Sequence, residues 1–478
     1  MDNKPRIIQG GMGASISNWE LARAVSLAGQ MGVVSGTALA SVFARRLQAG
    51  DEGGHVRRAV KAFPSPKIAN KVMEKYYNEG GLAEDGVYKR HPMYTINSSP
   101  ELLQLTVVGS FVEVWLAKEG HDGLVGINVL EKIQLPNLAT LYGAMLADVD
   151  FVIIGAGIPL HIPGALDLMA NHEAASIPFS VIGAERGDDF RIHFDPKETG
   201  FDGLPPLKRP LFYAIISSNV LATAMIKRAT GRVDGFIVET PTAGGHNAPP
   251  RGPLQLNEIG EPIYGEKDVV DLEKLAQAGL PFWMAGSYGT HEQLQSALDN
   301  GAEGIQVGTA FAFCDDSGMA EVDRLKVVHL ARQGEIKVFT DPKASPTGFP
   351  FKVATLDNSL YNDEVYQQRD RICDLGFLRA AYKKENGKLG YRCASEPEEI
   401  FVKKGGKMED TVGRKCLCNA LCSAAGFPQM TKSGRLEPTL VTSGDEVVNI
   451  PQFIQEGNET YSAQDVISCL LGEKLVTS

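Results

Sequence analysis

The sequence predicts a (β/α)8 TIM barrel, an α/β fold, and three observations support this prediction. Eight short runs are apolar nearly throughout, as expected of strands covered on both faces. Helical patterns separate most of these runs. No internal repeat of fixed period is present, so a solenoid or propeller is not expected. The alternation favours a parallel barrel, and a doubly wound open sheet stays an alternative because alternation alone does not prove closure.

The predicted strands are Arg6–Gln9, Met31–Ser35, Leu124–Val129, Asp150–Gly155, Leu211–Ile216, Val233–Glu239, Pro281–Ala285 and Gly304–Val307. Helices are expected at Asn18–Ala28, Leu102–Glu119, Asp268–Ala278 and His291–Asn300. These elements assign residues 1–356 to the barrel and residues 357–478 to a mainly helical or irregular C-terminal extension, whose last segment, 460–478, is expected to form one docking helix.

Two insertions interrupt the predicted barrel. The first, at residues 51–100 after the second strand, includes a helix near Lys67–Glu79. The second, at residues 178–210 after the fourth strand, is expected to carry a hairpin formed by Phe179–Ile182 and Phe190–Phe194. Residues 342–350 are rich in Pro, Gly and Ser and predict a loop.

The composition excludes several classes of protein. The 478 residues contain 47 Lys and Arg against 58 Asp and Glu, a net charge of −11 that argues against binding nucleic acid. No secretory signal precedes the first strand and no apolar run approaches about 18 residues, so no membrane span is expected. Seven cysteines, an odd number, do not suit an extracellular disulfide framework. We therefore expect a cytoplasmic protein.

Glycine is in excess, at 51 of 478 residues, and much of the excess follows predicted strands. Clusters occur at 10–13, 244–245, 286–289 and 308, which a parallel barrel brings to one face. Glycine there lets backbone N–H groups approach a ligand closely, and the hydroxyls of Ser287 and Thr309 could add donors. A single such glycine is often only a turn residue, but four clusters on one face favour a phosphorylated ligand.

His246 is the candidate catalytic residue. It lies between Gly244-Gly245 and Asn247, just past an apolar strand, and an imidazole can exchange protons near neutral pH. The alternative is a loop histidine bonded to backbone. No second histidine stands at metal-binding spacing, and no metal site is predicted.

Five segments, in order along the chain, carry a family resemblance: Ile7–Gly13, Gly126–Val129, Ala243–His246, Ala285–Gly289 and Gln306–Phe311. Through them the chain resembles the nitronate monooxygenase (2-nitropropane dioxygenase) family, which also includes flavin-dependent enoyl-acyl-carrier-protein reductases. The resemblance implies an FMN-binding TIM barrel. It implies that Gly11, Met12, Asn128 and Gly245 lie by the flavin, that Gly286, Ser287, Gly308 and Thr309 hold the phosphate, and that His246 is catalytic.

The resemblance implies a function as well as a cofactor. The first expectation is oxidation of alkyl nitronates with O2 to a carbonyl compound and nitrite. The alternative is an NAD(P)H-dependent enoyl-thioester reductase of fatty-acid or polyketide synthesis, with a carrier protein as partner. A barrel that binds a phosphorylated metabolite without redox chemistry is a third possibility. Three departures leave the substrate open: Gly11 replaces a common Pro, Thr242 a common Glu, and Lys352 an Arg. A homodimer is compatible with each reading.

Four cysteines gather late in the chain: Cys393, Cys416, Cys418 and Cys422. Their C-x-C-x3-C spacing differs from the C-x2-C pair of zinc ribbons. Structural thiols are the favoured interpretation, with a metal or cluster site and a redox role as alternatives.

Overall fold

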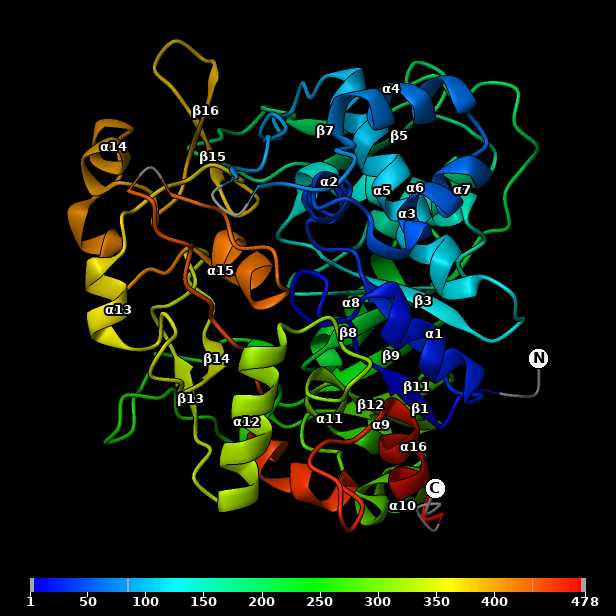
Figure 1. Cartoon of the computed structure of the whole chain (residues 1–478), viewed down its shortest axis with the longest axis vertical. Helices are drawn as coiled ribbons and strands as arrows, with labels where there is room; N and C mark the ends of the chain where they lie inside the picture. Colours follow the sequence, from blue (N-terminus) through cyan, green and yellow to red (C-terminus); the bar gives the residue numbers. More distant parts are fainter. Residues whose placement is uncertain (1–3, 84–85, 432, 474–478) are drawn as a thin grey trace.

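Eight parallel strands form the centre of the computed structural model, which describes residues 4–83, 86–431 and 433–473 (Figure 1). They are β1 (Ile7–Gln9), β2 (Gly32–Ser35), β3 (Val125–Leu130), β4 (Phe151–Gly155), β8 (Leu211–Ile216), β9 (Gly235–Glu239), β11 (Phe282–Ala285) and β12 (Gly304–Val307). Their order is β1-β12-β11-β9-β8-β4-β3-β2. A parallel bridge between Ile8 and Met31 joins the two ends of this order and closes the barrel.

The predicted barrel is therefore confirmed, and each of the eight predicted runs contains the core of one strand. The open-sheet alternative fails because β1 is hydrogen-bonded on both sides. The Gln9 N–H donates to the Met31 carbonyl at 2.9 Å, while residues 7–9 pair with residues 305–307 of β12.

A separate apolar cluster fills the inside of the barrel. Its members are Ile8, Met31, Val33, Phe151, Ile153, Tyr213, Ile237, Trp283 and Ala285. The Trp283 ring stacks on Tyr213 with centroids 4.9 Å apart, and its indole N–H donates to the Pro5 carbonyl at 2.8 Å. This packing leaves the carboxyl end of the barrel, rather than its middle, for a ligand.

Helices cover the outside of the barrel. They are α1 (Trp19–Leu27), α2 (Leu39–Gln48), α3 (His55–Ala62), α4 (Pro66–Tyr76), α5 (Pro100–Lys118), α6 (Gln134–Leu146), α7 (Ile162–Ala170), α8 (Asn219–Arg228), α9 (Leu272–Ala276), α10 (His291–Asp299), α11 (Thr309–Ala312) and α12 (Glu321–Gln333). Among the described helices, only α5 is long and apolar enough to cross a membrane, and 72% of its apolar window is buried in the fold, where it packs on α6 and α2.

The insertion after β4 differs from the prediction. β7 (Arg191–Phe194) pairs antiparallel with β5 (Ala175–Pro178), not with the run 179–182. Within that run, β6 (Val181–Ile182) pairs in parallel with β15 (Ala380–Lys383) of the C-terminal extension. An antiparallel hairpin is present, but its first strand is 175–178 rather than the predicted 179–182: the ladder ends with the Phe179 N–H, which donates to the Phe190 carbonyl at 2.8 Å.

The C-terminal extension contains more β-structure than predicted. β15 forms a hairpin with β16 (Leu389–Arg392). The remaining elements are α13 (Asp363–Gln368), α14 (Glu398–Lys403), α15 (Leu417–Ala424), α16 (Ala463–Leu471) and the 3₁₀ segments Met408–Thr411 and Asp445–Phe453. Within the predicted docking segment, α16 packs against α1 and α10. Nearer the barrel, β13 (Val338–Asp341) and β14 (Phe351–Ala354) form a hairpin around the predicted 342–350 loop, and β14 pairs with β10 (Gly245–His246).

Replacing Trp283 with Ala should lower the free energy of unfolding by about 3–5 kcal/mol, because it empties the centre of the barrel and leaves the Pro5 carbonyl without its donor. Chemical denaturation followed by circular dichroism measures this. Val220→Ala, at a side chain that is 70% exposed on α8, is the matched control and should change stability by less than about 0.5 kcal/mol. Equal stability of the two variants would contradict the packing argument.

Candidate active site

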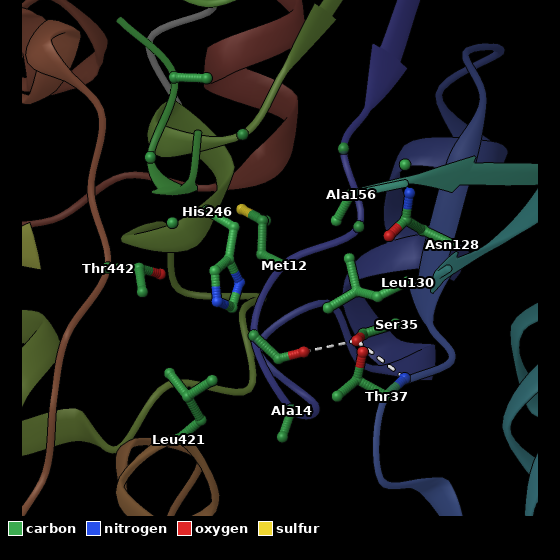
Figure 2. Close-up of a pocket in the computed structure, with 18 of the residues that line it drawn as sticks. Met12, Ala14, Ser35, Thr37, Asn128, Leu130, Ala156, His246, Leu421 and Thr442 are labelled. Carbon is green, nitrogen blue, oxygen red and sulfur yellow. Dashed lines mark hydrogen bonds between the residues drawn. The ribbon is translucent and has the colours of Figure 1, made fainter. Parts of the chain in front are cut away.

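The main cavity opens at the carboxyl ends of the barrel strands (Figure 2). The site residues expected from the sequence that line it are Gly11, Met12, Asn128, Gly245, His246, Gly286, Gly308 and Thr309. Residues up to 298 positions apart in sequence therefore meet at one place, as the barrel topology requires. Ser287 is the exception: it adopts a left-handed conformation with φ +54° and is not part of the cavity wall.

Small residues and amide side chains shape the inner part of the cavity. A Cβ at Gly11 would stand 2.3 Å from the Cβ of Asn128, so any larger residue there would displace the asparagine. Gly245 has φ +76° and open space where its Cβ would be. The Gln306 Oε1, on β12, is buried without a hydrogen-bond partner among the described residues. An unpartnered acceptor in a cavity wall suits a ligand that carries an N–H or O–H group.

The His246 ring projects into this cavity, close to Met12 and Thr442 (Figure 2). Its Nε2 is hydrogen-bonded to the Ser345 Oγ at 2.8 Å, which fixes the ring, and it meets the Phe351 ring edge-on at 4.6 Å between centroids. Burial and, secondarily, the nearby Lys132 lower the pKa of His246 well below its usual value. His246 is therefore neutral at physiological pH.

Lys132 and Glu239 form a second buried group of titratable side chains beside His246. Burial lowers the pKa of Lys132 to about 7 and raises that of Glu239 to about 7, and each partly counteracts the shift of the other. The Lys132 Nζ is buried without a hydrogen-bond partner among the described residues and stands 3.7 Å from the centre of the Phe349 ring. This group can exchange protons near neutral pH.

A second cavity adjoins the first. Glu239, His246, Ala156 and Ile215 line both, and Phe349, Val220 and Arg251 line only the second. The two cavities thus meet at Glu239 and His246. Arg251 is the one Lys or Arg side chain on either wall in the described part of the chain, and it lies on the outer one.

The C-terminal extension completes the main cavity. Segment 441–446 lies along β14: the Ala354 N–H donates to the Val441 carbonyl at 2.9 Å, and the Gly444 N–H donates to the Thr309 Oγ1 at 2.9 Å. The segment is further held by an ion pair between Lys352 and Asp445, 2.6 Å apart. Lys352, noted in the sequence as a departure from the family that the chain resembles, therefore anchors the extension.

Glu446, at the end of this segment, contributes a carboxylate to the cavity wall. A Cβ at Gly289 would stand 2.9 Å from its Oε2. Burial and the neighbouring Asp445 raise the pKa of Glu446 to about 7, although the backbone amides of Gly289 and Thr309 favour its ionised form. A carboxylate thus occupies part of the region where the sequence predicts a phosphate.

The extension also supplies an apolar wall, formed by Phe377, Leu378, Leu417 and Leu421, together with Cys418. Sequence reasoning missed this wall, Lys132, Glu239 and Glu446. Glu239 could have been found, because it ends a predicted strand on the face where ligands bind. Glu446 carries no such signal, since it reaches the site only through tertiary packing.

Residues 209–344 match the family model for nitronate monooxygenase. The chain resembles this family. The matched segment runs from β8 past β13 and includes His246, Gly286, Gly308 and Thr309. A comparison with curated proteins finds no match.

Several solved structures resemble the chain loosely. FabK from Thermotoga maritima is 16% identical, with a TM-score of 0.47 over 98% of this chain and 93% of the other. Nitroalkane oxidase from Streptomyces ansochromogenes is 14% identical, with a TM-score of 0.46 over 98% and 95%. The enoyl reductase domain of MlnA from Bacillus amyloliquefaciens is 10% identical, with a TM-score of 0.47 over 98% and 93%.

Replacing Lys132 with Met should stabilise the protein at pH 6.5 by about 1–3 kcal/mol, with part of the gain offset by the lost contact to Phe349. In the native protein the pKa of Lys132 is lowered, so burial of its charged form reduces the free energy of unfolding at pH values below 7. This reduction becomes smaller as the pH rises toward the pKa that the lysine has in the unfolded chain. The advantage of Lys132→Met should therefore shrink at pH 9.5. Denaturation curves at both pH values measure it, with the exposed Lys61→Met as control; a gain that does not depend on pH would contradict the assignment.

Proposed function

We propose that the chain is an FMN-dependent oxidoreductase that reduces an enoyl thioester with NAD(P)H as the electron donor. One observation carries the choice of reaction: the neutral, desolvated His246 stands between a glycine-lined inner cavity and apolar walls supplied by the C-terminal extension. Such a site binds an uncharged acyl group better than a small anion, because the main cavity wall has no Lys or Arg among the described residues.

The residues of the inner cavity fit a flavin. The free Gln306 Oε1 accepts hydrogen bonds, the Asn128 amide can both donate and accept, and Gly11 and Gly245 leave room for a ring system to approach the backbone. When bound, FMN supplies the hydride chemistry. Gly286, Gly308 and Thr309 would hold its phosphate, and Glu446 would be the neighbour of that phosphate.

His246 acts through its fixed orientation. Because Nε2 is bonded to Ser345, the Nδ1 atom is left for a ligand; it makes no hydrogen bond to any described residue. In the tautomer where the Ser345 hydroxyl donates to Nε2, Nδ1 carries the proton and can donate it to a thioester carbonyl oxygen. That hydrogen bond polarises the conjugated double bond toward hydride addition at the β-carbon. Glu239, which lines both cavities, would return the proton that the α-carbon requires, and Lys132 affects the pKa of this carboxyl group.

The walls of the two cavities can contact the acyl chain and the pantetheine arm of such a substrate. Phe377, Leu378, Leu417 and Leu421 can cover an acyl chain. The second cavity leads outward from Glu239 and His246 toward Arg251, a cation suited to the phosphate of a carrier-bound pantetheine arm. A carrier protein is accordingly the proposed partner.

Oxidation of an alkyl nitronate with O2 is the second candidate, and the family match over residues 209–344 favours it. In that reaction a neutral His246 would serve as the base that removes the α-proton of a nitroalkane. A nitronate anion, in contrast, would rely on Lys132 for its counter-charge.

Replacing His246 with Ala should leave flavin binding intact and lower kcat/KM by about 100-fold or more, because one positioned proton donor typically contributes at least that factor. Flavin content and steady-state rates are measured together. His329→Ala, on the exposed face of α12, is the control and should retain full activity. Unchanged turnover in His246→Ala would remove this residue from the mechanism.

Two assays on the same preparation separate the candidate reactions. Oxidation of NADPH with a medium-chain enoyl thioester is expected to exceed oxygen uptake with an alkyl nitronate. The double variant Leu417→Asp, Leu421→Asp places charge in the apolar wall and should raise KM for the long acyl substrate more than for a crotonyl one. Oxygen uptake with nitronate and no reduction of thioester would overturn the proposed reaction.

Glu446→Gln should tighten FMN binding about tenfold at pH 8, since it removes a charge facing the phosphate, worth about 1.4 kcal/mol. Because the pKa of Glu446 is about 7, its carboxyl group is protonated at pH 6, and the FMN affinity of the native protein should there approach that of the variant. Fluorescence titration measures both. Riboflavin, which has no phosphate, is the control ligand and should bind native and variant protein equally. An equal change in affinity for FMN and for riboflavin would show that Glu446 does not face the phosphate.

A further inference from the structure

The loop between β13 and β14, residues 342–350, holds the side chain of His246. Ser345 of this loop is fully buried, and its Oγ lies 2.8 Å from the His246 Nε2. The same hairpin also holds the backbone of the histidine, because His246 pairs antiparallel with Phe351 of β14. One hairpin therefore determines both where His246 lies and how its ring is turned.

The hydrogen bonds around Ser345 favour one tautomer of the imidazole. The Thr347 N–H donates to the Ser345 Oγ at 3.3 Å, and the Thr347 hydroxyl lies 2.8 Å from the same atom. The Ser345 hydroxyl has a single proton to donate, and an unprotonated imidazole nitrogen is a stronger base than a threonine hydroxyl. We therefore expect Ser345 to accept from Thr347 and to donate to the His246 Nε2. This arrangement leaves the ring proton on Nδ1.

The C-terminal extension binds this loop at three successive carbonyl groups. The Arg414 Nη1 donates to the Lys343 carbonyl at 2.8 Å and to the Ser345 carbonyl at 2.6 Å. The Lys415 N–H donates to the carbonyl between them, that of Ala344, at 2.9 Å. Because a guanidinium group keeps its proton in proteins, the two bonds from Arg414 do not depend on pH near neutrality.

Further contacts hold the extension against the loop. The Lys415 Nζ forms an ion pair with an Asp341 carboxylate oxygen at 3.2 Å, and both side chains are largely buried. The other oxygen of Asp341 accepts from the N–H groups of Lys343 and Ala344, at 2.8 and 3.0 Å. A Cβ at Gly413 would stand 3.2 Å from the Lys343 Cβ, so the two backbones are closely packed. The loop and the extension therefore form one packed unit.

We propose that Arg414 is a positioning residue for His246, which it orients through Ser345. Arg414 holds the Ser345 backbone, and the Ser345 hydroxyl in turn fixes the orientation and the tautomer of the imidazole. The effect of this positioning on turnover rests on the proposed function, in which His246 takes part in the reaction. The positioning itself is a property of the folded protein and can be measured without turnover.

The position of Arg414 in the chain connects two walls of the site. It lies three residues before Leu417, the first residue of α15, and Leu417 and Leu421 of that helix line the main cavity. In the proposed reaction, the segment that covers the acyl chain of the substrate thus also orients the group that donates to the thioester carbonyl. Sequence distance hides this connection, because Arg414 and His246 are joined only by the packing of the extension on the loop.

The two tautomers of His246 would act differently on a substrate. With the proton on Nδ1, this atom can donate to a carbonyl oxygen. With the proton on Nε2, the Nδ1 atom has a lone pair, which repels a carbonyl oxygen. An imidazole in the wrong tautomer, or turned away, therefore cannot polarise the thioester, although the surfaces that bind the flavin and the acyl chain are unchanged. Loss of positioning should consequently lower kcat and leave KM nearly constant.

The first test observes the tautomer directly in the full-length protein. Nuclear magnetic resonance of protein labelled with 15N at histidine separates protonated from unprotonated ring nitrogens, and His246→Ala identifies the His246 signals by their loss. The native protein should have its proton on Nδ1. Ser345→Ala and Arg414→Met should each show a mixture of the two tautomers, because the donor to Nε2 is removed or released.

Matched controls exist for both variants. Ser359 is also fully buried, and its Oγ accepts the N–H of the residue two positions later at 3.2 Å, as that of Ser345 does. Arg392 likewise donates from Nη1 to a carbonyl group of the extension, that of Lys404, at 2.8 Å. Ser359→Ala and Arg392→Met should leave the His246 signals as they are in the native protein.

The second test is steady-state reduction of an enoyl thioester. Ser345→Ala should lower kcat about 10- to 100-fold and Arg414→Met about tenfold, each with KM within about twofold of the native value, because misplacing a reacting group by a small distance has effects of this size. Ser345→Thr keeps the hydroxyl group and should stay within about threefold of the native kcat. Flavin content and circular dichroism establish that each variant is folded.

The outcomes separate the positioning from the reaction. A native His246 with its proton on Nε2, or His246 signals that are unchanged in Ser345→Ala, would overturn the positioning whatever the activity. Signals that change in Ser345→Ala but not in a folded Arg414→Met would remove Arg414 from it. If His246→Ala keeps full turnover while the tautomer still responds to Ser345→Ala and Arg414→Met, the role of His246 in the reaction fails and its positioning stands. Should Arg414→Met not fold, Arg414→Lys, which keeps one charged donor, is measured in its place.

Discussion

The candidate site depends on the hydrogen bonds that hold segment 441–446 between the barrel and β14. The Val441 carbonyl accepts from Ala354, the Thr309 hydroxyl accepts from Gly444, and the Asp445 N–H donates to the Thr242 carbonyl at 3.1 Å. The last two contacts join the chain just after β9 and β12 to residues more than 130 positions later. Without them, one side of the cavity would be open to solvent, so the extension is a structural part of the site.

The barrel strands could be predicted from the sequence because each is buried on both faces, and an unbroken apolar run is a strong signal of that environment. The pairing of β6 with β15 could not be predicted, since a strand two residues long carries no sequence pattern that indicates a partner 200 residues away. The β15–β16 hairpin did carry a signal. Asn386-Gly387 stands between its strands, the residue pair that favours the tightest hairpin turns, and the Lys384 N–H donates to the Lys388 carbonyl at 2.9 Å.

The residues of the site likewise divide into those that the sequence predicts and those that it does not. Glycines and His246 could be found because strand ends of a parallel barrel share one face, so position along the sequence translates into position in space. Lys132 and Glu446 could not, because nothing local distinguishes them from surface charges. Their importance comes from burial, which removes water from an amine and a carboxyl group and brings the pKa values of both to about 7.

This convergence of pKa values explains how a nearly uncharged cavity can still move protons. An acid and a base exchange a proton at little cost when their pKa values are close, and burial has brought Lys132 and Glu239 from opposite ends of the scale to about the same value. His246, whose pKa is lowered by the same burial and by Lys132, stays neutral beside them. The imidazole is therefore a donor of hydrogen bonds rather than a carrier of charge. In the proposed reaction the proton comes from Glu239, which lines both cavities, and Lys132 stands close enough to affect the pKa of this carboxyl group.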